Sequence, residues 1–150
     1  MKTKMQTRVW SGAVMAGALA ILAGCQSQSM SPSMEQRIDL SGSNEVPPVT
    51  TAAKGIAVIT VTADRSVRAE VTVSGMTPTA SHIHEGAAGA NGPVIVPFTK
   101  SETDTNVFVA SPGAKLTEAQ YASYKAGNLY VNVHSAKNAG GELRGQLKGN

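Results

Sequence analysis

The segment from Val67 to Val73 alternates strictly between apolar and polar residues, and this two-residue period restricts the possible folds more than any other feature of the sequence. Successive side chains of a β-strand point to opposite faces, so Val67, Val71 and Val73 share one face while Arg68 and Glu70 lie on the other. One buried and one hydrated face is typical of antiparallel sheets. We therefore expect antiparallel strands around one core.

Seven further short, largely apolar segments are separated by glycine, proline and other turn residues. We expect strands at 37–40, 56–62, 80–84, 94–99, 106–110, 129–134 and 143–147. Many short strands with turns of this kind, and a single helical segment, indicate an all-β domain. The predicted fold class is an antiparallel β-sandwich, similar to immunoglobulin or superoxide dismutase domains, with one short helix near residues 117–126.

The helical segment carries start and stop signals at its ends. Thr117 and Gln120 have the spacing of a capping box, in which each side chain bonds the backbone N–H of the other residue. Gly127 follows Lys125 and Ala126, and glycine very commonly ends a helix. These signals predict a helix over 117–126.

The first 24 residues have the pattern of a bacterial lipoprotein signal peptide. Lys2, Lys4 and Arg8 are followed by an apolar stretch up to residue 22 that is short for a membrane span. The stretch ends in Leu-Ala-Gly followed by Cys25, which resembles the lipobox that is cleaved before its lipidated cysteine. The alternative is a secretory signal with a chance cysteine. We favour the lipobox because Cys25 is the only cysteine of the chain.

The lipobox resemblance implies lipidation at Cys25. We expect a flexible tether over residues 25–36 and a folded domain over 37–150. The tether segment is rich in Ser, Gln, Met and Pro and offers little apolar surface to bury. Acyl chains buried in a bilayer would hold the domain on a membrane of the cell envelope, facing the periplasm or the exterior. Gln26 after the cysteine favours the outer membrane if the protein is Gram-negative.

The net charge of +3 belongs to the signal segment rather than to the domain. Lys2, Lys4 and Arg8 are three of the 13 basic residues, and the other ten balance the ten acidic residues. A neutral domain without a basic stripe or a set of stacking aromatic residues gives no support for a nucleic-acid partner. The sequence also lacks a serine nucleophile elbow, and we expect no enzyme activity.

The three histidines of the chain fall in two strand segments of matching pattern. His82 and His84 flank Ile83, and His134 follows Val133, so the two-residue period puts all three imidazoles on the face away from the core. Residues i and i+2 of one strand are about 7 Å apart, which lets both bind one ion. Three imidazoles suit Cu(II) or Zn(II), and we expect a metal site with copper favoured.

Four polar residues are predicted to support this metal site with hydrogen bonds that orient the imidazoles: Glu85, Asn132, Glu142 and Arg144. The histidine pattern also resembles the copper half of copper–zinc superoxide dismutase. That enzyme uses a fourth copper histidine, a bridging histidine and a disulfide. With three histidines and one cysteine, this chain cannot build them.

A structural role is the alternative interpretation of the histidines. In that case His82, His84 and His134 hydrogen-bond loop carbonyls and hold the glycine-rich segment 86–92 in place, while nearby buried polar residues satisfy backbone donors. A small ligand such as a sugar or a peptide is a third possibility.

Five motifs follow one another along the domain. They are Leu-Ser-Gly-Ser-Asn-Glu-Val-Pro-Pro at 40–48, Ser-His-Ile-His-Glu-Gly at 81–86, Gly-Ala-Asn-Gly-Pro-Val at 89–94, Gly-Asn-Leu-Tyr-Val-Asn-Val-His at 127–134 and Gly-Glu-Leu-Arg-Gly-Gln-Leu at 141–147. In this order they resemble the CHRD domain, which occurs in the animal protein chordin and in many bacterial secreted proteins. The resemblance implies a β-sandwich and an extracytoplasmic setting, and it does not by itself supply an activity.

We therefore expect a membrane-anchored, non-catalytic CHRD lipoprotein that binds a divalent transition metal, copper favoured, through His82, His84 and His134. The alternative is an adhesion or scaffold module that contacts an envelope protein or a matrix polymer, with structural histidines. An enzyme that uses the metal for oxygen chemistry is the least supported of the three.

Overall fold

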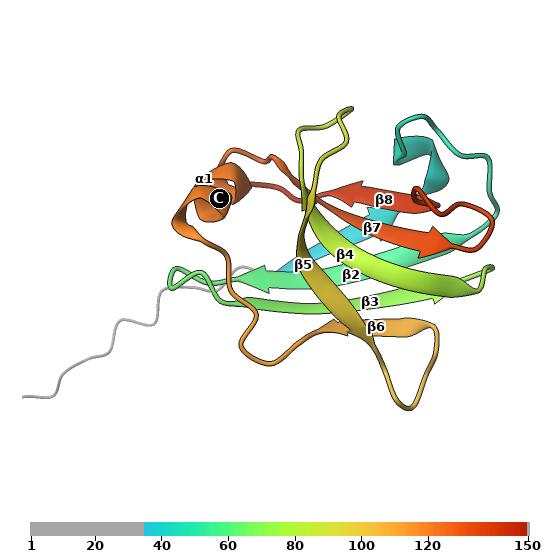
Figure 1. The fold of residues 1–150 in the computed structure, drawn as a ribbon, viewed down its shortest axis with the longest axis horizontal. Coiled ribbons are helices and arrows are strands. Elements are labelled where there is room, and N and C mark those ends of the chain that lie inside the picture. The colour runs from blue at the N-terminus through green and yellow to red at the C-terminus, as the bar shows by residue number, and fades with distance from the viewer. Residues whose placement is uncertain (1–34, 150) are drawn as a thin grey trace, which may run out of the picture.

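The computed structural model describes residues 35–149 and shows an all-β domain with one α-helix (Figure 1). The strands are β1 (Glu35–Leu40), β2 (Lys54–Val61), β3 (Val67–Ser74), β4 (Pro78–Glu85), β5 (Val94–Lys100), β6 (Val107–Ala110), β7 (Leu129–Ser135) and β8 (Leu143–Gln146). The helices are the 3-10 helix η1 (Gly42–Asn44) and the α-helix α1 (Glu118–Lys125). Each predicted strand is present at its expected place, so the all-β fold class is confirmed.

The strands form one antiparallel sheet in the order β1-β2-β3-β6-β5-β4-β7-β8. Strand β5 joins the two layers, because Val94 to Pro97 pair with β4 while Phe98 to Lys100 pair with β6. Figure 1 shows β5 crossing diagonally between these two neighbours. The two layers of the predicted sandwich are thus halves of one continuous sheet.

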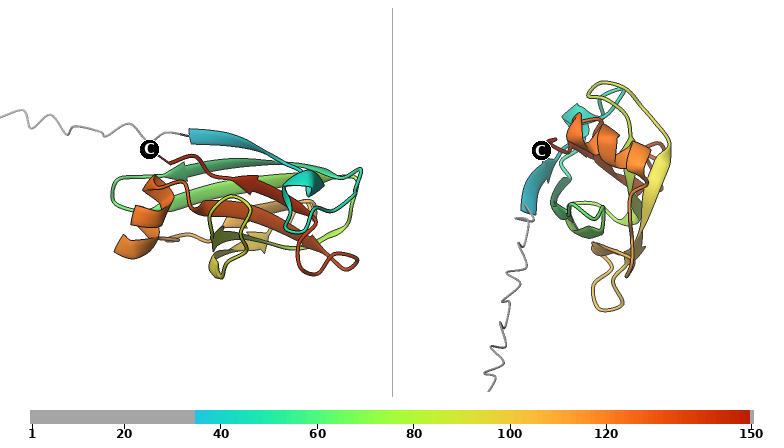
Figure 2. Two further views of the ribbon diagram at one scale, coloured as in Figure 1. Left: turned by 90° about the horizontal axis from the view of Figure 1, so that it is seen from above. Right: turned by 90° about the vertical axis from the view of Figure 1, so that its left-hand side faces the viewer.

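The edge strands β1 and β8 meet and nearly close this sheet. Ser41 and Arg144 exchange two backbone hydrogen bonds of 3.1 Å each. A side chain at Gly145 would lie only 2.6 Å from methyl groups of Ile38 and Leu40, so glycine is what lets the two edges touch. Both views in Figure 2 place β1 beside the C-terminal segment.

The core lies between the two layers and is built from alternate residues of the strands. Strand β2 buries Ala57, Ile59 and Val61 on one face, as the two-residue period predicts. Phe108 from β6 and Ile83 from β4 are at most 1% exposed. Fully burying one such Val, Ile or Phe side chain stabilises the fold by about 1.5–3 kcal/mol. The whole of this core cluster comes from residues 38–147.

Helix α1 begins with the predicted capping box. The Thr117 side chain accepts a hydrogen bond from the Gln120 backbone, and the Gln120 side chain accepts one from the Thr117 backbone. Gly127 follows the helix with a φ of 75°, a conformation that favours glycine. The helix packs onto the core through Tyr124, which is fully buried.

Strand β1 begins at Glu35, two residues before the predicted start at Arg37. Gln36, which we expected to end the tether, donates hydrogen bonds of 2.8 Å to the Tyr124 hydroxyl and to the Lys148 carbonyl. These contacts tie β1 to α1 and to the C-terminal segment.

The predicted signal peptide over 1–24, the lipidated Cys25 and most of the tether lie outside the described residues. Within residues 35–149, neither helix has the length and apolar character that crossing a membrane requires.

Alternation along β4 and its register with β7 place the three histidines on the same face of the sheet. Ile83 points into the core, so its neighbours His82 and His84 point to the opposite, outer face. The register places Asn132 across from His82. His134, two residues further along β7, therefore shares the outer face with the other two histidines.

Candidate metal centre

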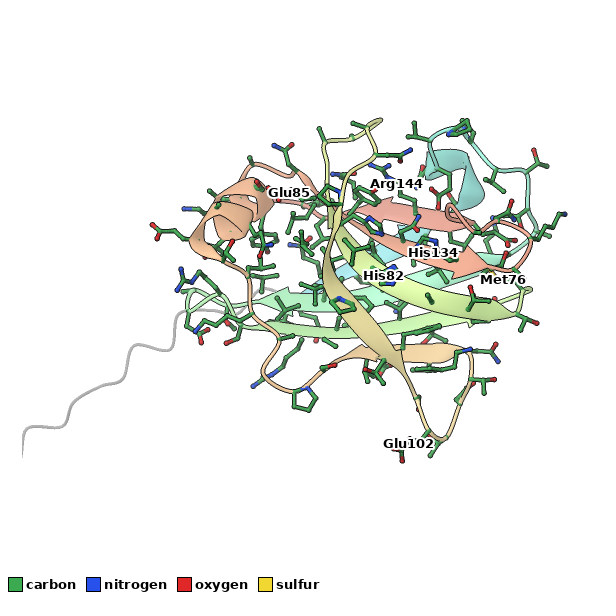
Figure 3. The ribbon with its side chains drawn as sticks, in the orientation of Figure 1. Met76, His82, Glu85, Glu102, His134 and Arg144 are labelled. Atoms are coloured by element: carbon green, nitrogen blue, oxygen red, sulfur yellow. The ribbon has the colours of Figure 1, made fainter. Side chains whose placement is uncertain are left out.

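The three histidines converge on the outer face of β4 and β7. One ring nitrogen from each of His82, His84 and His134 lies within 4.8 Å of the other two. Figure 3 shows His82 and His134 close together on the neighbouring strands. A metal ion binds imidazole nitrogen at about 2.0–2.1 Å, so a cluster of this size can hold one ion.

His84 has one ring nitrogen that is bonded and one that is free. Its Nδ1 lies 2.9 Å from the carbonyl oxygen of Gly92, and a carbonyl only accepts, so Nδ1 carries the proton. Its Nε2 therefore carries a lone pair. That atom is buried and has no hydrogen-bond partner among the described residues. Buried polar atoms are nearly always paired, and a lone pair left free inside a histidine cluster is what a metal ligand requires.

His134 is held in the same tautomer by a second loop. Its Nδ1 donates to the carbonyl oxygen of Ala139 at 2.9 Å, which leaves the lone pair on Nε2. Nε2 of His134 accepts a hydrogen bond of 3.1 Å from Nδ1 of His82, whose proton an ion would displace. Two nitrogens on one tetrahedral or square-planar ion are separated by about 2.9–3.4 Å, given metal–nitrogen bonds near 2.0–2.1 Å. The expected ligand atoms are thus His82 Nδ1, His84 Nε2 and His134 Nε2.

The surroundings favour neutral imidazoles, the form that binds metals. Burial, followed by repulsion from His134 and His84, lowers the pKa of His82 from 6.5 to about 4. Burial is also the largest cause of the lowered pKa of His84. The hydrogen bond to the Gly92 carbonyl opposes this shift, while the charges of His134 and Arg144 add to it.

A stack of side chains holds His84 from one side. The ring of Tyr130 lies nearly parallel to the imidazole, with centroids 4.9 Å apart and planes at 11°. The guanidinium carbon of Arg144 lies 3.5 Å from the centroid of the Tyr130 ring, a cation–π contact. Arg144 is only 2% exposed, so this stack is buried.

Arg144 also fixes the loop over residues 86–93. Its guanidinium donates to the backbone carbonyls of Ala87 and Ala90 and to the side chain of Asn91. The backbone N–H of Gly92 donates to the Tyr130 hydroxyl at 3.1 Å. The loop is therefore positioned by the same two side chains that stack beside His84, and it presents the Gly92 carbonyl to that imidazole.

The four predicted supporting residues do not orient the imidazoles through hydrogen bonds found in residues 35–149. Glu85 accepts from Ser123, and it points away from His84 because adjacent strand residues face opposite sides. Glu142 accepts from Thr51 and Ser135.

The other two predicted supporting residues are likewise engaged elsewhere. Asn132 donates to Glu45 at 2.6 Å. Arg144 hydrogen-bonds no imidazole; it reaches His84 through Tyr130, through the loop and through its charge.

The groups that do orient the imidazoles are the backbone carbonyls of Gly92 and Ala139. This agrees with the structural interpretation for two histidines, since His84 and His134 each bond a loop. It also leaves the metal interpretation open, because each of those bonds uses Nδ1 and leaves Nε2 for an ion. In the sequence, the glycine-rich segment 86–92 pointed to the Gly92 carbonyl. No sequence feature pointed to the Ala139 carbonyl.

The lowered pKa of His82 predicts a titration that NMR can follow in the metal-free protein. We expect the imidazole of His82 to stay unprotonated at pH 5 and to titrate at about pH 4, against 6.5 for an ordinary histidine. Because the unfolded chain binds this proton at higher pH than the folded one, the stability that depends on His82 is lost as the pH falls from 6.5 to 4. A midpoint near 6.5 in the folded protein would contradict the buried, crowded environment described here.

The CHRD domain model matches residues 37–147, which is most of the chain and contains all three histidines. No protein with curated annotation matches the sequence, and no solved structure matches it either. The match begins within β1 and ends one residue after β8, so the family unit and the folded unit coincide. This chain belongs to the CHRD domain family.

Proposed function

We propose that this CHRD domain binds one transition-metal ion, copper in preference to zinc, through His82 Nδ1, His84 Nε2 and His134 Nε2. The observation that carries the proposal is the buried, unpartnered Nε2 of His84 within a cluster of three ring nitrogens. Copper is favoured because imidazole ligands bind Cu(II) more tightly than Zn(II) in a site that imposes no geometry.

Three protein ligands leave at least one coordination position for an outside group. His84 is buried, while His82 and His134 are each partly exposed, so an ion held by them is reached from the surface. An accessible ion of this kind supports a role in metal handling or protection rather than a closed structural site. We propose no catalytic step.

An extracytoplasmic setting supports the same function. The CHRD match supports an extracellular-type module. The lipobox-like sequence before Cys25 supports a lipid anchor that holds the domain at the cell envelope. In a Gram-negative cell, Gln26 favours the outer membrane.

A scaffold or adhesion module is the second candidate. It is supported by the bonds from His84 and His134 to loop carbonyls, which stabilise exposed loops whether or not a metal binds. Under this candidate the loops contact an envelope protein or a matrix polymer.

Calorimetric titration separates the two candidates. We expect one Cu(II) or Zn(II) to bind per chain of residues 26–150 without a histidine tag, and His134→Ala to abolish stoichiometric binding. The matched control is Glu85→Gln, which keeps an acceptor for Ser123 and points away from the cluster, so it should bind metal as the wild type does.

The opposite results would favour the scaffold. Absence of binding below the millimolar range for Zn(II) and for copper in both oxidation states, or binding that survives a triple alanine variant of His82, His84 and His134, would refute the assigned site. A loss of thermal stability in His134→Ala without any metal uptake by the wild type would make the histidines structural.

The anchor makes its own prediction in the cell. We expect the wild-type protein to incorporate labelled palmitate and to sediment with membranes, and Cys25→Ser to do neither. A Cys25→Ser protein that still fractionates with membranes would place the attachment elsewhere.

A further inference from the structure

The histidine cluster brings no negative charge to an ion. Among the His, Cys, Asp and Glu side chains of residues 35–149, only the three histidines join it. A neutral imidazole binds a metal ion through a lone pair, so the three ligands add no charge of their own. The charge of a bound ion is therefore not compensated by its protein ligands.

Three carboxylates of neighbouring segments are committed to other partners. Glu85 accepts from Ser123, and Glu142 accepts from Thr51 and Ser135. Glu45 accepts from Asn132, and burial raises its pKa to about 7 against the opposing effect of the Arg144 charge. None of the three hydrogen-bonds a histidine among the described residues.

The nearest fixed charge in the stack beside the cluster is positive. Arg144 is buried against Tyr130, and Tyr130 lies against His84. The guanidinium is thus separated from His84 by one aromatic ring. Its positive charge repels a metal ion in the cluster, and the repulsion grows in proportion to the charge of the ion.

We propose that this site selects monovalent copper over divalent ions. The inference rests on the proposed metal function and names the oxidation state that the site takes. Imidazole binds copper in both states, so the ligand type does not decide between them. The charge of the ion decides between the two states. Cu(II) and Zn(II) bring two uncompensated charges into a partly buried site beside a guanidinium, and Cu(I) brings one.

The first test compares affinities in the wild-type protein of residues 26–150, which contains the whole described core and lacks Cys25. Cu(I) is measured without oxygen against bicinchoninate, and Cu(II) and Zn(II) against nitrilotriacetate. We expect a dissociation constant for Cu(I) that is at least tenfold lower than for Cu(II). The triple alanine variant of the histidines must lose Cu(I) binding, which excludes the methionines as the site.

The second test adds the missing negative charge. Pro97 is exposed and lies across from His82 on β5, so a residue at this position points to the same outer face. Pro97→Glu should strengthen Cu(II) binding about tenfold and Cu(I) binding about threefold, because the attraction scales with the charge of the ion. Pro97→Gln is the matched neutral control and should leave the ratio of the two affinities unchanged.

The third test removes the positive charge. Arg144→Met and Arg144→Lys both lose the bonds of the guanidinium to the loop, but only the lysine keeps the charge. We expect the ratio of Cu(I) to Cu(II) affinity to fall further in Arg144→Met than in Arg144→Lys. If neither Arg144 variant folds, the comparison of Pro97→Glu with Pro97→Gln still tests the preference for Cu(I).

The outcomes distinguish the preference for monovalent copper from the proposed metal binding on which it rests. If no ion binds, the metal function itself fails. If the wild type binds Cu(II) or Zn(II) as tightly as Cu(I), or if Pro97→Glu strengthens Cu(I) and Cu(II) equally, the metal function stands and the preference for monovalent copper is overturned.

Discussion

The candidate metal site depends on the contacts that the buried guanidinium of Arg144 makes. The guanidinium stacks on Tyr130, and its donors hold the carbonyls of the loop over residues 86–93. A buried charge is tolerated only when it is well bonded, so the loop and the arginine require each other. Through that loop, the Gly92 carbonyl fixes the proton of His84 on Nδ1 and leaves Nε2 free.

Most of the fold was predictable because its signals are local. The two-residue period located the strands, and the capping box with Gly127 located α1. The joining of the layers through β5 was not predictable, because it depends on which neighbour each half of one strand meets. The contact of β1 with β8 depends in the same way on Gly145 lying against Ile38 and Leu40.

The candidate site was also predictable only in part: features set by adjacent residues followed from the sequence, and contacts with distant loops did not. The faces of His82, His84 and His134 followed from alternation alone, and their convergence followed from the pairing of β4 with β7. The groups that orient the imidazoles were missed because they are backbone carbonyls on loops, which have no residue-type signature. Glu85 was predicted to support the histidines because it is adjacent to His84 in the sequence, whereas in the structure it accepts from Ser123 on the other face of the strand.

The most direct measurement is the anomalous diffraction of copper in crystals of the metal-loaded domain, recorded on both sides of the absorption edge. We expect a single copper peak at about 2.0–2.2 Å from His82 Nδ1, His84 Nε2 and His134 Nε2. The loop carbonyls of Gly92 and Ala139 should still accept from the other nitrogens of His84 and His134. A peak elsewhere on the molecule, or histidines that keep their mutual hydrogen bond with no copper between them, would contradict the proposed site.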